Sequence, residues 1–159
     1  MSFAPVYSAA AHTLILGTYP SPKSRETGFY YGHAQNRFWP LLAQLLHTDV
    51  PQTVEQKKAL ICSHDLALWD TLASCTITGA ADASIKNPVP NEIAALCAQL
   101  PVRQVLCNGA AAYRLCRQFH TLQIPVFQLP STSPANAAWS MERLLGAWGG
   151  FFSAGINRP

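Results

Sequence analysis

The chain has 159 residues, a mass of 17.3 kDa and 49% hydrophobic residues, a size and composition that suit a single domain with a substantial core. Its 11 lysines and arginines against 8 acidic residues give a formal net charge of +3, which permits a nucleic-acid partner without the strongly basic character of many nucleic-acid-binding domains. No stretch reaches the roughly 18 apolar residues of a membrane-spanning helix, and no secretory signal pattern opens the chain, so we expect one soluble domain over residues 1–159, a monomer with no membrane partner.

Short apolar runs alternate with segments of helical pattern along the whole chain. The strands are expected at residues 13–16, 66–69, 105–107 and 126–129, and the helices at about 36–46, 53–64, 91–100, 110–119 and 137–148. The helix at 53–64 opens with Thr53-Val-Glu-Gln56, a match to the capping box. An order of this kind predicts an α/β fold with parallel strands, because each helix carries the chain back to the start of the next strand.

Five cysteines are present and none forms a C-x-x-C pair. Most of them fall inside apolar helix or strand patterns, where a free thiol acts as a small hydrophobic side chain. This usage indicates a reducing, cytoplasmic compartment. The chain also lacks the H-E-x-x-H, phosphate-loop and nucleophile-elbow motifs and any paired Cys/His spacing, so we expect no metal and no cofactor.

The unusual residues of this sequence follow the predicted strands. In open parallel sheets the ligand lies beyond the carboxyl ends of the strands, and here the corresponding loops are residues 17–35, 70–90, 108–109 and 130–136. Their convergence at one edge of the sheet predicts a site there.

The first of these loops combines a glycine with aromatic side chains. Gly17 has no Cβ, so the chain can turn sharply and present backbone amides, although an ordinary strand-end turn has the same signature. Tyr30, Tyr31 and Phe38 offer planar faces on which a nucleic-acid base could stack. Part of this set is expected to be simply core.

Asn36 carries both a hydrogen-bond donor and an acceptor, so it could orient a water molecule or bind the polar edge of a base. As a residue just before a helix it could equally be a helix cap. The nearby His33 could carry a proton near neutral pH, but a structural histidine is the more common case.

Two further loops carry hydroxyls, amides and one cation. The segment Pro130-Ser-Thr-Ser-Pro-Ala-Asn136 presents three adjacent hydroxyls, which suit either phosphate binding or a turn with a helix cap. In the loop at residues 79–90, Ser84 and Lys86 could reach a DNA backbone or belong to a solvated loop.

Taken in order, these motifs resemble the uracil-DNA glycosylase superfamily, in particular its hypoxanthine-DNA glycosylase branch. The segments that carry the resemblance are Gly17-Thr-Tyr-Pro20, Gly28-Phe-Tyr-Tyr-Gly-His-Ala-Gln-Asn-Arg-Phe-Trp39, Leu66-Ala-Leu-Trp-Asp70, Asp82-Ala-Ser-Ile-Lys86 and Pro130-Ser-Thr-Ser-Pro-Ala-Asn136. The resemblance implies a three-layer α/β/α sandwich around a four-stranded parallel sheet. It also implies a monofunctional glycosylase that cuts a base–sugar bond without a covalent enzyme intermediate.

The same resemblance assigns roles to individual residues. Asn36 takes the place of the catalytic asparagine, since the first-motif position used by mismatch-specific uracil glycosylases holds Tyr19 here. The base pocket is assigned to Gly17, Thr18, Tyr19, Tyr31 and Asn108, with Tyr31 stacking on the base, and DNA contacts are assigned to Ser84, Lys86, Ser131, Thr132, Ser133 and Asn136. The histidine frequent in the last motif of the superfamily is absent, which leaves the group that stabilises the departing base unassigned.

These roles predict an enzyme of base excision repair that acts on damaged DNA, flips the nucleotide, and removes hypoxanthine first and uracil second. Two other classes remain open. The chain could be a catalytically silent module that binds damaged DNA through the same pocket, or a hydrolase of free nucleosides or nucleotides. Base release from lesion DNA, lesion binding without release, and turnover of free deoxyinosine distinguish the three.

Overall fold

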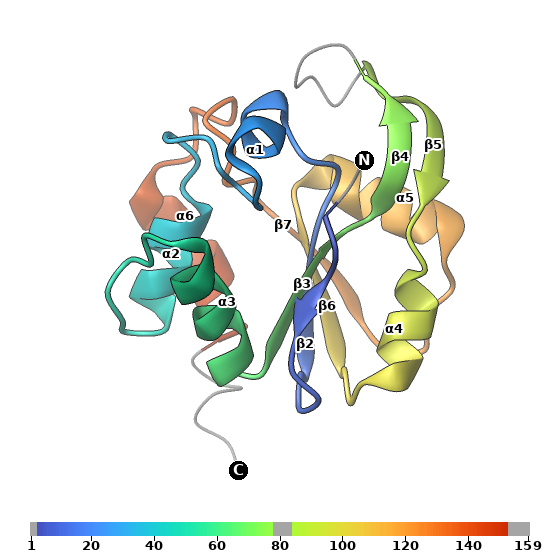
Figure 1. Cartoon of the computed structure of the whole chain (residues 1–159), viewed down its shortest axis with the longest axis horizontal. Helices are drawn as coiled ribbons and strands as arrows, with labels where there is room; N and C mark the ends of the chain where they lie inside the picture. Colours follow the sequence, from blue (N-terminus) through green and yellow to red (C-terminus); the bar gives the residue numbers. More distant parts are fainter. Residues whose placement is uncertain (1–2, 78–83, 153–159) are drawn as a thin grey trace.

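The computed structural model describes residues 3–77 and 84–152, which form a central sheet between two layers of helices (Figure 1). The sheet has the strand order β1-β3-β2-β6-β7. Its strands are β1 (Val6–Tyr7), β2 (Thr13–Gly17), β3 (Leu66–Asp70), β6 (Gln104–Asn108) and β7 (Val126–Leu129). The last four pair in parallel, which confirms the predicted four-stranded parallel sheet. β1 adds an antiparallel edge of two residues, too short to show a period in the sequence.

Helices cover both faces of this sheet, which confirms the three-layer architecture. One face packs against α2 (Phe38–Leu45), α3 (Val54–Ser63) and α6 (Met141–Gly149), and the other against α4 (Ile93–Gln99) and α5 (Ala110–Phe119). Successive strand residues serve opposite faces, because side chains alternate along a strand. In β2, Ile15 belongs to the first cluster, whereas Leu14 and Leu16 belong to the second.

The helix signals in the sequence are confirmed with two changes. The predicted capping box forms, since the Thr53 hydroxyl accepts from Gln56 N and the Gln56 side chain reaches back to Thr53 N. The last helix begins at Met141 rather than at residue 137, because Ser140 caps it. A short helix α1 (Pro22–Thr27) lies in the segment read as loop; Ser21 caps it and a left-handed Gly28 ends it.

The segment after β3 also differs from the loop that was predicted there. It contains a hairpin of β4 (Leu72–Thr76) and β5 (Lys86–Pro90), with residues 78–83 outside the described part. The strand β5 was not predicted because it contains Pro88 and Pro90. Proline has no N–H to donate to a β-ladder and is tolerated only at sheet edges and irregular pairings. The pairing is indeed irregular, with two register shifts.

All five cysteines lie within the described residues and are free thiols, two of them buried. Among the described helices, none combines the length and the apolar composition needed to cross a membrane.

Candidate active site

A cavity of about 520 Å³ opens at the carboxyl ends of the parallel strands. Gly17, Asp70, Asn108 and Leu129, which end β2, β3, β6 and β7, all line it. The loops after these strands complete the wall. The predicted convergence of loops at this edge of the sheet is therefore confirmed.

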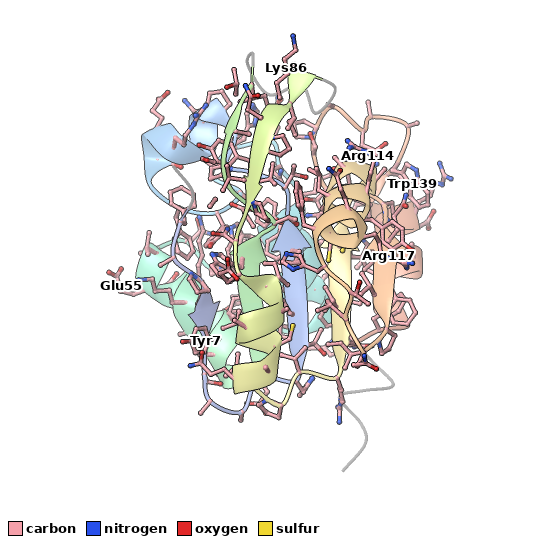
Figure 2. All side chains as sticks on the ribbon, turned by 90° about the vertical axis from the view of Figure 1, so that its right-hand side faces the viewer. Tyr7, Glu55, Lys86, Arg114, Arg117 and Trp139 are labelled. Carbon is pink, nitrogen blue, oxygen red and sulfur yellow. The ribbon has the colours of Figure 1, made fainter. Side chains whose placement is uncertain are left out.

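Most of the predicted site residues meet in this cavity. Those that line it are Gly17, Thr18, Tyr19, Tyr31, Asn36, Asn108, Ser131, Thr132, Ser133 and Asn136. Ser84 and Lys86 are not among the lining residues; Lys86 is exposed at the start of β5 and points outward from the end of the hairpin (Figure 2). His33 also lies outside the lining, and its Nδ1 accepts a hydrogen bond from Gln35 N at 3.0 Å, a structural role.

Position 17 requires a glycine because two polar side chains leave no space for a Cβ there. Its backbone is that of an ordinary strand residue, but a Cβ there would lie 2.5 Å from Asp70 Oδ1 and 2.8 Å from the Tyr31 hydroxyl. The absence of a side chain at this position therefore leaves room for both polar groups beside the end of β2.

Tyr31 occupies a strained position. Its φ of 54° lies in the left-handed region that a bulky side chain rarely adopts, and such strain concentrates at functional sites. One face of its ring stacks on Phe38, with centroids 4.2 Å apart and planes 26° apart, while the residue lines the cavity. Burial, followed by the neighbouring Asp70, raises the pKa of its hydroxyl, so the phenol stays protonated at neutral pH. By contrast Tyr30 is core, as expected for part of this set: only 2% of it is exposed, and its hydroxyl donates to Ala4 O.

Asn36, Thr132 and Asn108 form a hydrogen-bonded chain along the cavity wall. Thr132 N donates to Asn108 Oδ1 at 3.0 Å. The other end of that amide is therefore Nδ2, which donates to Thr132 Oγ1, also at 3.0 Å. The Thr132 O–H then donates to Asn36 Oδ1 at 2.9 Å. Phe38 N donates to the same oxygen at 2.9 Å, so the direction of every bond in the chain is fixed by a backbone N–H.

These hydrogen bonds determine which end of the Asn36 amide is available to a ligand. Oδ1 accepts two hydrogen bonds, one of them from Phe38 N at the start of α2. The N-cap of α2 is Arg37, so Asn36 supports the start of the helix from the residue before the cap and is not the predicted cap itself. Nδ2 makes no hydrogen bond with any residue in the described part of the chain and is left as a donor in a residue that lines the cavity.

Thr132 is buried, whereas the neighbouring Ser131 and Ser133 are partly exposed. It is fully buried, and its hydroxyl is committed to Asn108 and Asn36, so the geometry does not favour the predicted phosphate contact by this residue. Ser131 and Ser133 are partly exposed, and their oxygens accept backbone N–H groups of the same loop. Burial separates the three hydroxyls into one inward-facing group and two at the surface.

Arg37 fastens the loop at residues 130–136 to the start of α2. Its guanidinium donates to the carbonyls of Ser133 at 3.0 Å and Asn136 at 3.1 Å and also to Trp139 O, while its backbone N donates to Thr132 O. The guanidinium is planar and carries several N–H donors in fixed directions, so one side chain can bind all of these carbonyls. The compact ammonium group of a lysine cannot reproduce this geometry. Nothing in the sequence distinguished this arginine.

Replacing Arg37 with lysine is expected to lower the free energy of unfolding by about 1–3 kcal/mol, because charge-assisted hydrogen bonds to the loop carbonyls are lost. Hydrogen exchange is expected to accelerate selectively in residues 130–139. Urea denaturation and exchange mass spectrometry measure the two effects. Arg117→Lys, on the exposed face of α5, is the control; equal exchange in both variants would contradict the fastening role.

Asp70 is a site residue that sequence reasoning did not single out. It ends β3 in the wall of the cavity, is only 4% exposed, and its Oδ2 makes no hydrogen bond with the residues described. Burial raises the pKa of this carboxyl to about 7. The available signal was its position, since an acidic residue directly after a buried strand falls at the ligand-binding edge.

Comparison with known proteins agrees with this geometry. The sequence profile of the uracil DNA glycosylase superfamily matches residues 4–148. The chain is 28% identical over 143 residues to a hypoxanthine DNA glycosylase of Methanosarcina acetivorans, covering 89% of this chain and 90% of the relative. It is 32% identical over 110 residues to a hypoxanthine DNA glycosylase of Methanosarcina barkeri, covering 67% and 69%.

A solved structure extends the agreement to the fold. The solution NMR structure of a Methanosarcina acetivorans protein named as a uracil DNA glycosylase superimposes with a TM-score of 0.84 and 26% identity, covering 99% of this chain and 98% of that one. The resemblance inferred from the sequence motifs is thereby confirmed. The chain belongs to the uracil DNA glycosylase superfamily.

Proposed function

We propose that this protein is a monofunctional DNA glycosylase that excises hypoxanthine first and uracil second by hydrolysis of the base–sugar bond. The observation that carries the proposal is the Asn36 amide, held at its Oδ1 by Thr132 and Phe38 and open at Nδ2 toward the cavity. The superfamily supports glycosylase chemistry, and the names of the two Methanosarcina relatives support hypoxanthine as the base.

The flipped base would lie against Tyr31. Because Phe38 supports one face of this ring, the ring is a rigid platform, and stacking of a base on an aromatic side chain contributes about 1–3 kcal/mol. Gly17, Thr18, Tyr19 and Asn108 form the surrounding wall. Rotation of the nucleotide out of the duplex is the step that makes such a pocket accessible to a base.

Asn36 would hold the attacking water by donating from Nδ2 to the water oxygen. As the glycosidic bond breaks, its electron pair leaves with the base and a cationic sugar carbon develops, which a positioned weak nucleophile can capture. The water oxygen bonds to that carbon and its proton passes to solvent. No covalent bond to the protein is needed, and the Asn36 amide is neutral throughout.

The DNA backbone would be held by side chains at the rim. The Ser131 and Ser133 oxygens accept backbone N–H groups, which leaves each O–H to donate to a phosphate oxygen. Asn136 braces the same loop through its Nδ2–Ser131 O bond. Ser84 and Lys86 would reach the backbone from the hairpin, where Lys86 is exposed at the outer end (Figure 2).

The test uses end-labelled oligonucleotides with one deoxyinosine or deoxyuridine, single- and double-stranded, followed by alkaline cleavage of abasic sites. We expect cleavage at deoxyinosine to be fastest and at deoxyuridine slower. Tight binding to lesion DNA with no base release in single turnover would replace the proposal with a silent binding module. Turnover of free deoxyinosine but not of DNA would replace it with a nucleoside hydrolase.

A further inference from the structure

One polar group in the cavity has no part in the function proposed so far. Asp70 lines the cavity at the end of β3 and is 4% exposed, yet its Oδ2 has no hydrogen-bond partner among the described residues. A buried polar group left without a partner costs free energy, so its retention at a binding site indicates a partner supplied by a ligand.

Contacts with Asn91 and Gly17 determine where Asp70 lies. Its backbone O accepts from Asn91 Nδ2 at 2.8 Å, and Gly17 leaves room for Oδ1, so the backbone is held while Oδ2 has no hydrogen-bond partner among the described residues. The titratable groups that face it are the hydroxyls of Tyr30 and Tyr31, whose pKa values are both raised by burial. Burial raises the pKa of the Asp70 carboxyl to about 7, and no cation of the described residues is among the causes of this shift.

The other titratable residues of the described lining are three tyrosines, Tyr19, Tyr30 and Tyr31. Burial raises the pKa values of the Tyr30 and Tyr31 hydroxyls, so neither readily donates a proton near neutral pH. The described lining contains no histidine. Asp70 is the carboxyl of the described lining, and with a pKa raised to about 7 its protonated and ionised forms are both populated near neutral pH.

We propose that Asp70 is the catalytic acid that protonates the departing purine at N7, an inference that rests on the proposed glycosylase function. The C1′–N9 bond breaks and its electron pair remains on the purine. The Asp70 carboxyl transfers its proton to N7, so the base leaves as neutral hypoxanthine rather than as an anion. Water adds to C1′ and loses a proton to solvent, and the Asp70 carboxylate regains a proton from solvent once the base has left.

This role predicts the sign of the pH dependence. The acid form is the active one, so the rate of the chemical step is expected to be constant below the pKa of about 7 and to fall tenfold for each pH unit above it. If Asp70 instead acted ionised, as an acceptor for the N1–H of the base, the rate would rise through the same pH.

The experiment measures single-turnover rate constants on deoxyinosine DNA from about pH 5 to about pH 9 for the wild type and Asp70→Asn. We expect Asp70→Asn to be about 100-fold slower at low pH and to lose the descending limb, with lesion-DNA affinity changed less than about threefold. Glu55→Gln, the same exchange on an exposed side chain of α3, is the matched control (Figure 2).

A second substrate tests the atom that receives the proton without relying on any variant. In 7-deaza-2′-deoxyinosine a carbon replaces N7, so the wild type is expected to cleave it slowly and without the descending limb, and Asp70→Asn to slow it no further. A wild-type rate that rises through pH 7, or Asp70→Asn with the wild-type rate and slope, would overturn the acid role alone. Absence of wild-type cleavage at every pH would instead refute the proposed function itself.

Discussion

Replacing Asn36 with alanine is expected to slow the chemical step on deoxyinosine DNA by about 10³-fold while leaving DNA affinity within about threefold of the wild type. The physical reason is that the variant removes the free Nδ2 donor, whereas the aromatic platform and the loop hydroxyls stay in place. Single-turnover kinetics measure the rate, and fluorescence anisotropy with lesion DNA measures the affinity.

The control for this variant is Gln35→Ala. Gln35 is exposed, adjoins Asn36 in the chain and does not line the cavity. We expect its rate constant to match the wild type within about twofold. Comparable losses of rate and affinity in Asn36→Ala would contradict a role in positioning the water and would leave Asn36 with the structural role of accepting from Phe38 N.

Replacing Thr132 with valine is expected to slow the same step by about 100-fold, although Thr132 touches neither the base nor the water in this proposal. The variant keeps the shape of the side chain and removes the hydroxyl between Asn108 and Asn36. Asn36 Oδ1 then keeps one donor instead of two, so the amide is free to turn. Asn108 Nδ2 loses a buried acceptor, which is expected to cost about 1–3 kcal/mol of folding free energy.

Thr132→Ser separates positioning from general destabilisation. Serine restores the hydroxyl and lacks only the methyl group, so we expect it to recover most of the rate while the smaller side chain still costs some stability. The informative comparison is kcat against KM: loss of positioning lowers kcat, whereas KM for DNA stays near the wild-type value. If serine were as slow as valine, packing rather than the hydrogen-bonded chain would be the cause.

The site contains two groups of polar residues, at the ends of β6 and β3, with β2 between these strands. One consists of Asn108, Thr132 and Asn36, whose hydrogen bonds follow a fixed direction and end in a donor. The other is Asp70 beside Gly17, whose Oδ2 has no hydrogen-bond partner among the described residues. In the proposed reaction the first group would position the attacking water and the second would protonate the departing base.

The local pattern of the sequence was enough to predict the parallel sheet and the helices that cover it, although not β1, α1 or the β4–β5 hairpin. The apolar runs and the helices between them gave the four parallel strands at the right places, because burial of alternate side chains leaves a local periodic pattern. The α5 helix at Ala110–Phe119 matches its prediction in both limits. The order of elements also placed the site, because parallel strands joined by helices bring their carboxyl ends to one edge.

The tertiary structure decided what the site residues do. Gly17 was read as a turn, but the reason for glycine is a carboxyl and a hydroxyl from distant parts of the chain that approach its Cα. Thr132 was grouped with two surface serines, and only its burial showed that its hydroxyl faces Asn36 and Asn108. Asp70 was only the first residue of the predicted loop at 70–90, and its role became visible with the cavity and with the lack of a partner for Oδ2 among the described residues. Periodicity is local and can be read along a chain, whereas hydrogen-bond partners and desolvation come from residues 24 to 96 positions apart and exist only after folding.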